Sequence, residues 1–308
     1  MPFAALAEVV LALVAAPTPP QQPPDEVARM TPRQKAALVV VSGLPAPRGA
    51  GGVLVRRWNG TAPRPRDALV FVDQEGGLVR AFPALPPQLD ASGYASRAAA
   101  AAAGRAAGRA LRAAGVDVDL APVLDAASGP LGPRHFRRSE LGLAFARGLQ
   151  AGGTTACPKH FPGLGSAQVS TDDAPRVRAR VLRRELRGFR AAIRGGARCI
   201  MVSHAFYGTF GGRRALTAPA AYRLLRRLGF EGVAVTDSLS VVQGRWPVRW
   251  ARNAARAGAD LLLFTSPRDA RRAVRGLVPV ARRGDLDDAV RRVIRLRRAL
   301  GLRPRPGW

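Results

Sequence analysis

Short apolar runs alternate along this chain with longer segments rich in alanine, arginine and leucine. Each run is continuously apolar, which is typical of parallel strands covered by helices. The predicted strands are 51–55, 68–73, 116–122, 154–160, 198–204, 232–238 and 260–266. Seven strands and an eighth, less defined one, in β–α order without a break in composition, predict a single (β/α)8 barrel. A doubly wound open sheet is the alternative, but no GxGxxG motif follows the first strand.

The sequence also marks the ends of several helices. Ser96 can cap a helix that ends at Gly115. Ser139 can cap the next helix, and Asp285 can cap the last one. The last helix has an apolar stripe that consists of Ala289, Val293, Leu296 and Leu300. Its remaining surface is expected to be a solvated face with four arginines: Arg291, Arg292, Arg295 and Arg298.

The 308 residues are 47% hydrophobic and 23% charged, which is ordinary for a globular protein and excludes a wholly disordered chain. The net charge of +28 is not ordinary, and by itself it suggests a polyanionic partner. However, only Lys35 and Lys159 among the 49 cationic residues are lysine, and alanine, glycine and proline are also abundant, as expected from a G+C-rich coding sequence. No basic motif with interleaved aromatic residues is visible, so nucleic acid is not expected as a partner.

Two features bear on cellular location. Cys157 and Cys199 lie in short apolar runs without a CxxC motif or a Cys/His cluster, so we expect two small buried hydrophobic residues and no metal site. Residues 1–24 combine an apolar stretch with a proline-rich spacer, a candidate leader ahead of a domain at 25–308. No Lys or Arg precedes the apolar stretch and Glu8 interrupts it, so export to the cell envelope and a cytoplasmic location both stay open. No later apolar stretch is long enough to span a bilayer.

Ionisable residues follow five of the predicted strands at the point where each strand ends. These residues are Asp73, Asp125, Lys159 with His160, His204 and Asp237. Reactive groups of such barrels lie at these ends, and burying unpaired charges is costly, so the set predicts a functional pocket. Lys159 stands out because a tight pocket can require a compact ammonium where the chain otherwise uses arginine. The inward carboxylate of Asp237 indicates sugar chemistry, while phosphate or aldol chemistry, with a Schiff base on Lys159, is the alternative.

The same residues belong to a series of motifs that resembles glycoside hydrolase family 3, in its single-domain β-N-acetylhexosaminidase branch. KHFPGLG (159–165) resembles the KHFPGHG signature, with leucine in place of the second histidine, and FVDQEGGLVR (71–80) resembles the D-x-EGG-x-V element. Further matching segments are GVDVDLAPVLD (115–125), GPRHF (132–136), IMVSHAFY (200–207), LTAPAAYRLLRRLGFEGVAVTDSLS (216–240), AGADLLL (257–263) and VIRLRRALGL (293–302). An ordered set of this kind is far more specific than a single glycine motif.

The resemblance implies a (β/α)8 barrel and a retaining, two-step glycosidase that needs no metal and no organic cofactor. Asp237 matches the family's nucleophile. The positions that match sugar-binding residues are Asp73, Arg134, Lys159 and His160. His204 is a further candidate for substrate binding. The expected partner is a carbohydrate with terminal β-linked sugars, above all N-acetylglucosamine from cell-wall glycans, which is released through a covalent glycosyl-enzyme.

Three departures from the family's pattern matter. The hexosaminidase loop Asp-Ser-His, whose histidine is the acid/base, is Ser-Thr-Asp at 170–172 here. Ala81 stands where an arginine is expected, with Arg80 one residue earlier, and Ser238 replaces a second aspartate. Asp172 is therefore the candidate acid/base, and a turn or helix-capping role is its alternative. The alternatives for the whole chain are a catalytically impaired carbohydrate-binding barrel and a β-glucosidase-type specificity.

Overall fold

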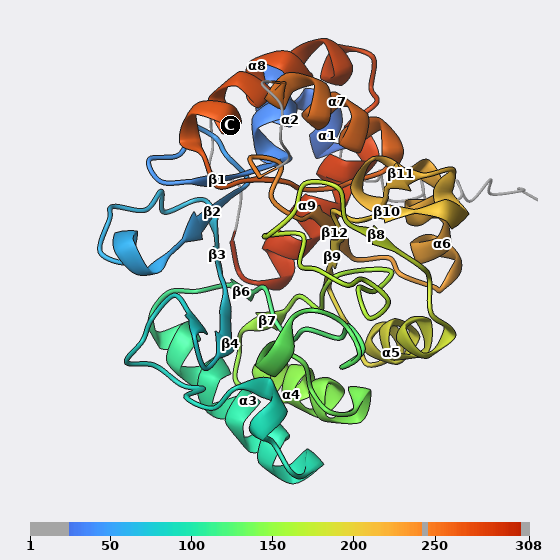
Figure 1. Ribbon diagram of the computed structural model, residues 1–308. Coiled ribbons are helices and arrows are strands. Elements are labelled where there is room, and N and C mark those ends of the chain that lie inside the picture. Colours follow the sequence, from blue (N-terminus) through green and yellow to red (C-terminus); the bar gives the residue numbers. More distant parts are fainter. Residues whose placement is uncertain (1–24, 242–245, 303–308) are drawn as a thin grey trace, which may run out of the picture.

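Short parallel strands close into a barrel in the computed structural model, which describes residues 25–241 and 246–302 (Figure 1). The barrel strands are β1 (Val40–Gly43), β2 (Gly52–Val55), β3 (Leu69–Val72), β6 (Val118–Asp119), β7 (Thr155–Ala156), β9 (Cys199–Val202), β12 (Val233–Thr236) and β13 (Leu262–Phe264). One sheet has the order β13-β1-β2-β3-β6-β7, and β9 pairs with β12. Parallel bridges from Phe161 to Val202 and from Val235 to Leu261 close the circle. The predicted (β/α)8 barrel is confirmed, and the candidate leader at 1–24 lies outside the described residues.

Helices pack around the outside of this barrel (Figure 1). They are α1 (Glu26–Arg29), α2 (Pro32–Leu38), α3 (Arg97–Ala113), α4 (Ser139–Ala151), α5 (Arg183–Arg194), α6 (Pro219–Arg227), α7 (Pro247–Ala257), α8 (Pro267–Arg282) and α9 (Asp287–Ala299). The β–α alternation is incomplete at the start, because only a loop joins β1 to β2 and a single 3-10 turn, Arg57–Asn59, lies between β2 and β3. Among the described residues, no helix has the length and apolar character needed to cross a bilayer.

Small strands extend the loops that follow the barrel strands. The hairpin of β4 (Gln74–Gly76) and β5 (Val79–Arg80) follows β3. A second small sheet has the order β11-β10-β8 and joins loops after β7 and β9. Its strands are β8 (Arg178–Ala179), β10 (Phe206–Tyr207) and β11 (Arg213–Arg214). These loops lie beyond the carboxyl ends of the barrel strands, where active sites of this fold are built.

The structure corrects two of the three predicted helix caps. Ser96 does cap α3, because its side chain accepts the N–H of Ala99. Ser139 instead forms the first residue of α4, after an N-cap residue that makes no side-chain cap. Asp285 lies before the N-cap residue of α9 and pairs with Arg283. The sequence places such residues near the start of a helix, but it does not fix which side chain accepts the helix's first free N–H groups.

The expectation that Cys157 and Cys199 are unpaired hydrophobic residues is wrong in one respect. Both are buried, as predicted, but they form a disulfide with a Cα–Cα distance of 4.6 Å. Cys199 begins β9 and Cys157 immediately follows β7, the strand that precedes β9 around the barrel. Because 42 positions separate the two cysteines, no local sequence pattern indicates this pairing. The pairing depends on how neighbouring strands lie in the barrel.

The arginines of α9 are not a uniform solvated face. Arg292 donates to Asp260, whose side chain is 1% exposed, at 3.0 Å. Asp260 also accepts from Arg226 of α6 at 2.6 Å and from the N–H of Ala234 at 2.7 Å. Burial raises the pKa of Asp260, although the two guanidinium groups and this N–H oppose the rise. The expectation of a solvated face is therefore wrong for Arg292, whereas Arg295 is exposed.

Candidate active site

Lys159, at the loop that follows β7, bridges two carboxylates from the loop after β3. Its Nζ lies 2.7 Å from Asp73 Oδ1 and 2.6 Å from Glu75 Oε1, and its side chain is only 3% exposed. Burial lowers the pKa of Lys159, but the carboxylates of Asp73 and Glu75 outweigh this and raise it above its ordinary value. The lysine is therefore a fixed ammonium that orients Asp73, whose own side chain is 34% exposed and free to meet a ligand.

Glu75 also binds Arg134, which extends the cluster to the loop after β6. Arg134 Nε and Nη2 donate to the two oxygens of Glu75 at 2.8 Å each, a bidentate pair. Burial raises the pKa of Glu75, but Lys159 and Arg134 prevail and lower it to about 2. Sequence reasoning missed Glu75. The signal was its spacing from Asp73, because alternate residues of an extended segment point to the same side.

Asp125, which follows β6, holds His160 and the chain around it. Asp125 Oδ2 lies 2.7 Å from His160 Nδ1, while Oδ1 accepts the N–H groups of His160 and Leu164 at 3.1 and 2.9 Å. Burial raises the pKa of Asp125, but His160 and these N–H groups lower it below its ordinary value. An ionised Asp125 therefore fixes the orientation of the imidazole through Nδ1.

Asp237, at the end of β12, is a partly accessible carboxylate in a mostly buried setting. Its side chain is 18% exposed; Oδ1 accepts the N–H of Ser238 at 2.8 Å and Oδ2 lies 3.3 Å from His204 Nδ1. Burial raises the pKa of Asp237, but His204, His160, the Ser238 N–H and Lys159 together lower it. Burial in turn lowers the pKa of His204, so this imidazole is uncharged at neutral pH, with its Nδ1 facing Asp237 Oδ2. The arrangement keeps Asp237 ionised.

The loop that departs from the family pattern lies beside this cluster. Asp172 is 67% exposed at its side chain, and its Oδ2 lies 3.7 Å from Arg134 Nη1. Its N–H donates to Ser170 Oγ at 3.1 Å, and Ser170 itself is buried. The Asp172 carboxylate also acts on His204, raising the pKa of that imidazole against the larger effect of burial. Asp172 is therefore an exposed acid that meets Arg134 at the edge of the cluster.

Arg80, which lies one residue before the position where the family has an arginine, does not take part in the cluster around Lys159. Arg80 Nε and Nη1 donate to the carbonyl oxygens of Gly77 and Pro83 at 2.6 Å each, and the side chain also contacts Gln88. Ala81 is buried. Arg80 thus holds the β4–β5 hairpin in shape rather than facing the carboxylates of Asp73 and Glu75.

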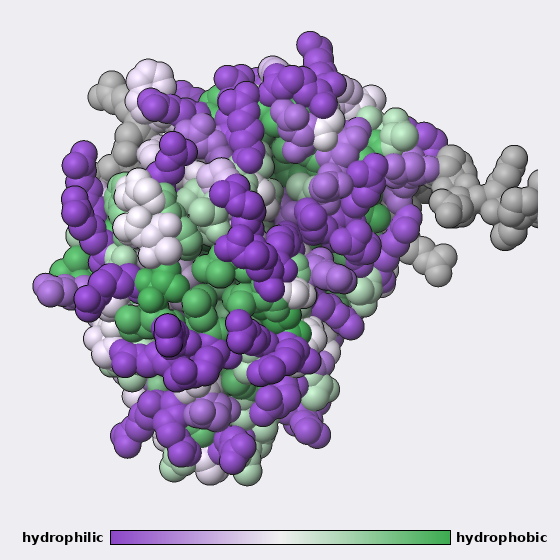
Figure 2. Space-filling model, turned by 90° about the vertical axis from the view of Figure 1, so that its right-hand side faces the viewer, coloured by the Kyte–Doolittle hydropathy of each residue, from purple (hydrophilic) through white to green (hydrophobic). Residues whose placement is uncertain are grey.

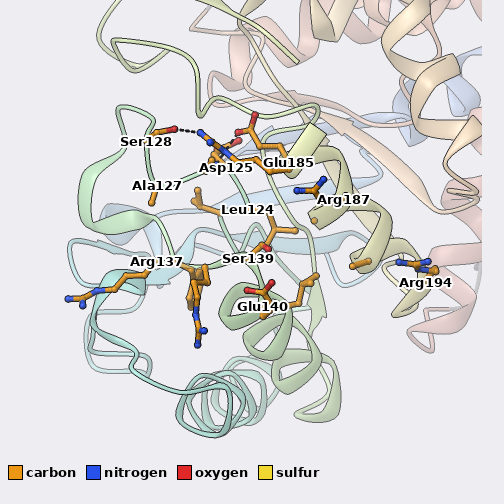
Figure 3. Close-up of a pocket in the computed structure, with 18 residues that line it drawn as sticks. Leu124, Asp125, Ala127, Ser128, Arg137, Ser139, Glu140, Glu185, Arg187 and Arg194 are labelled. Atoms are coloured by element: carbon orange, nitrogen blue, oxygen red, sulfur yellow. Dashed lines mark hydrogen bonds between the residues drawn. The ribbon is translucent and has the colours of Figure 1, made fainter. Parts of the chain in front are cut away.

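A groove of about 740 Å³ lies between α4, α5 and the loop after β6 (Figure 3). Asp125 and Glu185 line it together with Ser128 and Arg187, but neither Lys159 nor Asp237 does. It is therefore separate from the cluster described above, which it meets only through Asp125. Within the described ranges, no three or more His, Cys, Asp or Glu side chains are grouped so that they could hold a metal ion.

Comparisons with known proteins agree on one family. The model of the glycosyl hydrolase family 3 N-terminal domain matches residues 56–296. A β-hexosaminidase of Methylococcus capsulatus is 34% identical over 229 residues, which are 66% of this chain and 68% of that protein.

Solved structures of this family have the same fold. A family 3 β-N-acetylglucosaminidase from a Paenibacillus species matches 91% of this chain with a TM-score of 0.79 and 25% identity, and the chain spans 64% of that enzyme's length. A β-N-acetylhexosaminidase from Beutenbergia cavernae matches 89% of this chain and 99% of its own, with a TM-score of 0.76 and 28% identity. The chain therefore belongs to glycosyl hydrolase family 3 and is a glycoside hydrolase.

Proposed function

We propose that this glycoside hydrolase is a β-N-acetylhexosaminidase that releases terminal β-linked N-acetylglucosamine with retention of configuration. The observation that carries the proposal is Asp237: an ionised, partly accessible carboxylate at a strand end, whose Oδ1 accepts the Ser238 N–H, whose Oδ2 faces His204, and which lies close to a lysine–carboxylate cluster. A carboxylate in this state is a competent nucleophile at an anomeric carbon. The β-hexosaminidase and β-N-acetylglucosaminidase relatives support the choice of sugar.

In the first step, an oxygen of Asp237 bonds to the anomeric carbon while the bond to the leaving oxygen breaks. Asp172 donates its proton to that oxygen, so the leaving group departs as an alcohol. In the second step, Asp172 takes a proton from water, the water oxygen attacks the same carbon and the bond to Asp237 breaks. Two inversions give net retention.

Asp73, Lys159, Arg134 and His160 bind the sugar in this mechanism. The exposed side of the Asp73 carboxylate accepts from ring hydroxyls while Lys159 holds its other oxygen. Asp125 fixes the His160 ring so that its remaining edge meets the substrate in one orientation. The sequence places His204 among these residues. Its contact with Asp237 and its burial support a role through the nucleophile instead.

The test compares wild type, Asp237→Asn and Asp172→Asn on aryl β-N-acetylglucosaminide. We expect Asp237→Asn to lose turnover by about 10³-fold or more and a fluorosugar to label Asp237 in the wild type. Azide should restore turnover of Asp172→Asn as a β-glycosyl azide, because azide attacks without base assistance. Absence of aryl glycoside hydrolysis together with absence of labelling would contradict the proposal.

One observation favours a second candidate function, a carbohydrate-binding barrel with little turnover. Asp172 is 67% exposed and its carboxylate meets Arg134 only at 3.7 Å, so it is loosely held for transfer of a proton to the leaving oxygen. Saturable binding of N-acetylglucosamine without turnover at any pH, in wild type and Asp172→Asn alike, would select this function.

The natural glycan and the specificity form a separate part of the proposal. We expect fragments of cell-wall glycans to be preferred, since a protein with net charge +28 is attracted to anionic wall polymers. The alternative is a β-glucosidase-type specificity. Initial rates on aryl β-glucoside, aryl β-N-acetylglucosaminide and isolated wall fragments distinguish these outcomes.

A further inference from the structure

Glu185 is a buried carboxylate on α5 that joins two loops of the candidate active site. The residue is 2% exposed, and its Oε1 accepts the N–H of Gly165 at 2.7 Å and the N–H of Ala126 at 3.0 Å. Ala126 follows Asp125, and Gly165 ends the segment that begins with Lys159 and His160. One oxygen atom therefore fixes the spacing of the loop after β6 and the loop after β7.

The glycines of this segment allow the carboxylate to approach. A Cβ atom at Gly163 would lie 2.2 Å from Glu185 Cδ, and one at Gly165 would lie 2.7 Å from Oε1. Either contact is too short to exist without a shift of the carboxylate or the loop. Gly163 also has φ +126°, which side-chain-bearing residues rarely adopt. Glu185 is thus the neighbour that requires glycine at position 163, and at position 165 it shares this role with Ala126, whose Cβ would lie 2.6 Å away.

The link continues from these N–H groups to the sugar-binding side chains. Asp125 lies next to Ala126, and its carboxylate holds both the Nδ1 atom and the backbone N–H of His160. Tyr207 supports the same loop from β10, because its hydroxyl donates to the carbonyl oxygen of Gly163 at 2.8 Å. A displacement of the Glu185 carboxylate therefore moves Asp125 and His160 relative to each other.

We propose that Glu185 is a positioning residue for the glycosidase reaction, which holds the Asp125–His160 pair and the loop 159–165 in the geometry that binds the sugar. The proposal rests on the proposed function. It assigns to Glu185 no contact with substrate; the residue acts through two backbone N–H groups. Its effect is expected on substrate affinity more than on the chemical step.

The protonation state of Glu185 adds a readout. Burial raises its pKa to about 7; the Asp125 carboxylate adds to the rise, while the two N–H groups and Arg184 oppose it. The Tyr207 hydroxyl also lies near and stays protonated, because burial raises its pKa. Above about pH 7 the ionised Glu185 makes charge-assisted bonds to both N–H groups, and below it these bonds weaken. Sugar binding should therefore weaken as pH falls through this range.

The experiment measures KM and kcat of wild type, Glu185→Gln and Glu140→Gln between about pH 8 and pH 6. Glu140 is the matched control, since it lines the same groove but is exposed (Figure 3). In wild type and Glu140→Gln, KM should rise about fivefold as pH falls, with kcat less affected. In Glu185→Gln, KM should be high throughout and show no step in this range. A Glu185→Gln variant with the wild-type KM and pH profile would overturn the proposal.

A second measurement is independent of turnover. The amide signals of Ala126 and Gly165 in the NMR spectrum of the whole protein should titrate with a midpoint near pH 7 in wild type, and this titration should vanish in Glu185→Gln. If the protein hydrolyses no glycoside, the titration still tests the link between Glu185 and the loops. If hydrolysis occurs but neither amide titrates, the positioning role fails while the proposed function stands.

Discussion

At the scale of single residues, the two lysines of the chain show where an ammonium is used in place of a guanidinium. Lys159 meets Asp73 and Glu75 within 2.7 Å, and Lys35 meets Asp287 at 2.7 Å. Both lysines are buried in a chain whose other cations are arginine. At Lys159, the ammonium is a compact donor that fits between two converging carboxylates, where the planar guanidinium needs more width. The sequence singled out Lys159, but only its contacts explain the choice.

We predict that Lys159→Arg lowers kcat/KM by about 10²-fold or more, because the guanidinium displaces Asp73 from its sugar-binding position. Steady-state kinetics on an aryl glycoside measure the effect. Lys35→Arg is the control: it changes the other buried lysine, which joins α2 to α9, and should leave kcat/KM unchanged. Equal kinetics for the two variants would contradict this explanation.

At the scale of elements, the strand and helix types were predictable and their edges were not. The strand β1 was absent from the seven predicted strands because α2 runs into it without a turn residue: the chain reads QKAALVVVSG from 34 to 43. The Glu185 contact and the Asp260 network were equally hidden, since each joins side chains from separate elements. Local periodicity reports which face of an element is apolar, not which polar group it meets.

The Asp260 network gives a prediction for α9. Arg292→Ala should lower the free energy of unfolding by about 1–3 kcal/mol, because buried Asp260 loses one of its two guanidinium partners. Arg295→Ala removes an exposed arginine of the same helix and should change it by less than about 0.5 kcal/mol. Urea unfolding followed by circular dichroism compares them, and equal effects would restore the solvated-face interpretation.

The disulfide gives a second prediction at this scale. Closing a loop of 42 residues restricts the unfolded chain, and its loss should cost about 4 kcal/mol. Urea unfolding of wild type with and without a reductant measures this cost. The Cys157→Ala/Cys199→Ala variant is the control, since its stability should not respond to the reductant. A wild type that is equally stable in both conditions, or whose intact mass shows two free thiols, would contradict the pairing.

At the scale of the whole molecule, the net charge of +28 and the active-site charges are separate features. Figure 2 shows one face on which hydrophilic residues predominate around a smaller hydrophobic area. Two charged pairs of the site, Lys159 with Glu75 and Arg134 with Glu75, are instead largely buried. Salt screens exposed charges strongly and buried pairs much less. The surface charge therefore bears on where the protein accumulates rather than on its chemistry.

This separation predicts two different responses to salt. Between about 50 and 500 mM salt, kcat/KM on a neutral aryl glycoside should change less than about twofold, because the Lys159–Glu75 and Arg134–Glu75 pairs are largely shielded from solvent. Association with an anionic polymer should weaken by more than about tenfold over the same range. The value of kcat/KM and the affinity for the anionic polymer are measured on the same protein preparation. A parallel fall of kcat/KM would mean that surface arginines contribute to capture of the neutral substrate.

The sequence by itself determined the barrel, the family and the strand ends at which ionisable residues gather, because apolar runs and motif order are local properties. Only the tertiary structure decided the pairings. Lys159 and Asp73 are 86 positions apart, and Glu185 and Ala126 are 59 apart. Closing a barrel brings such distant positions within hydrogen-bond distance, and no local pattern records which atoms then meet. Glu185 and the disulfide were missed for that reason, whereas Glu75 had a local signal in its spacing from Asp73.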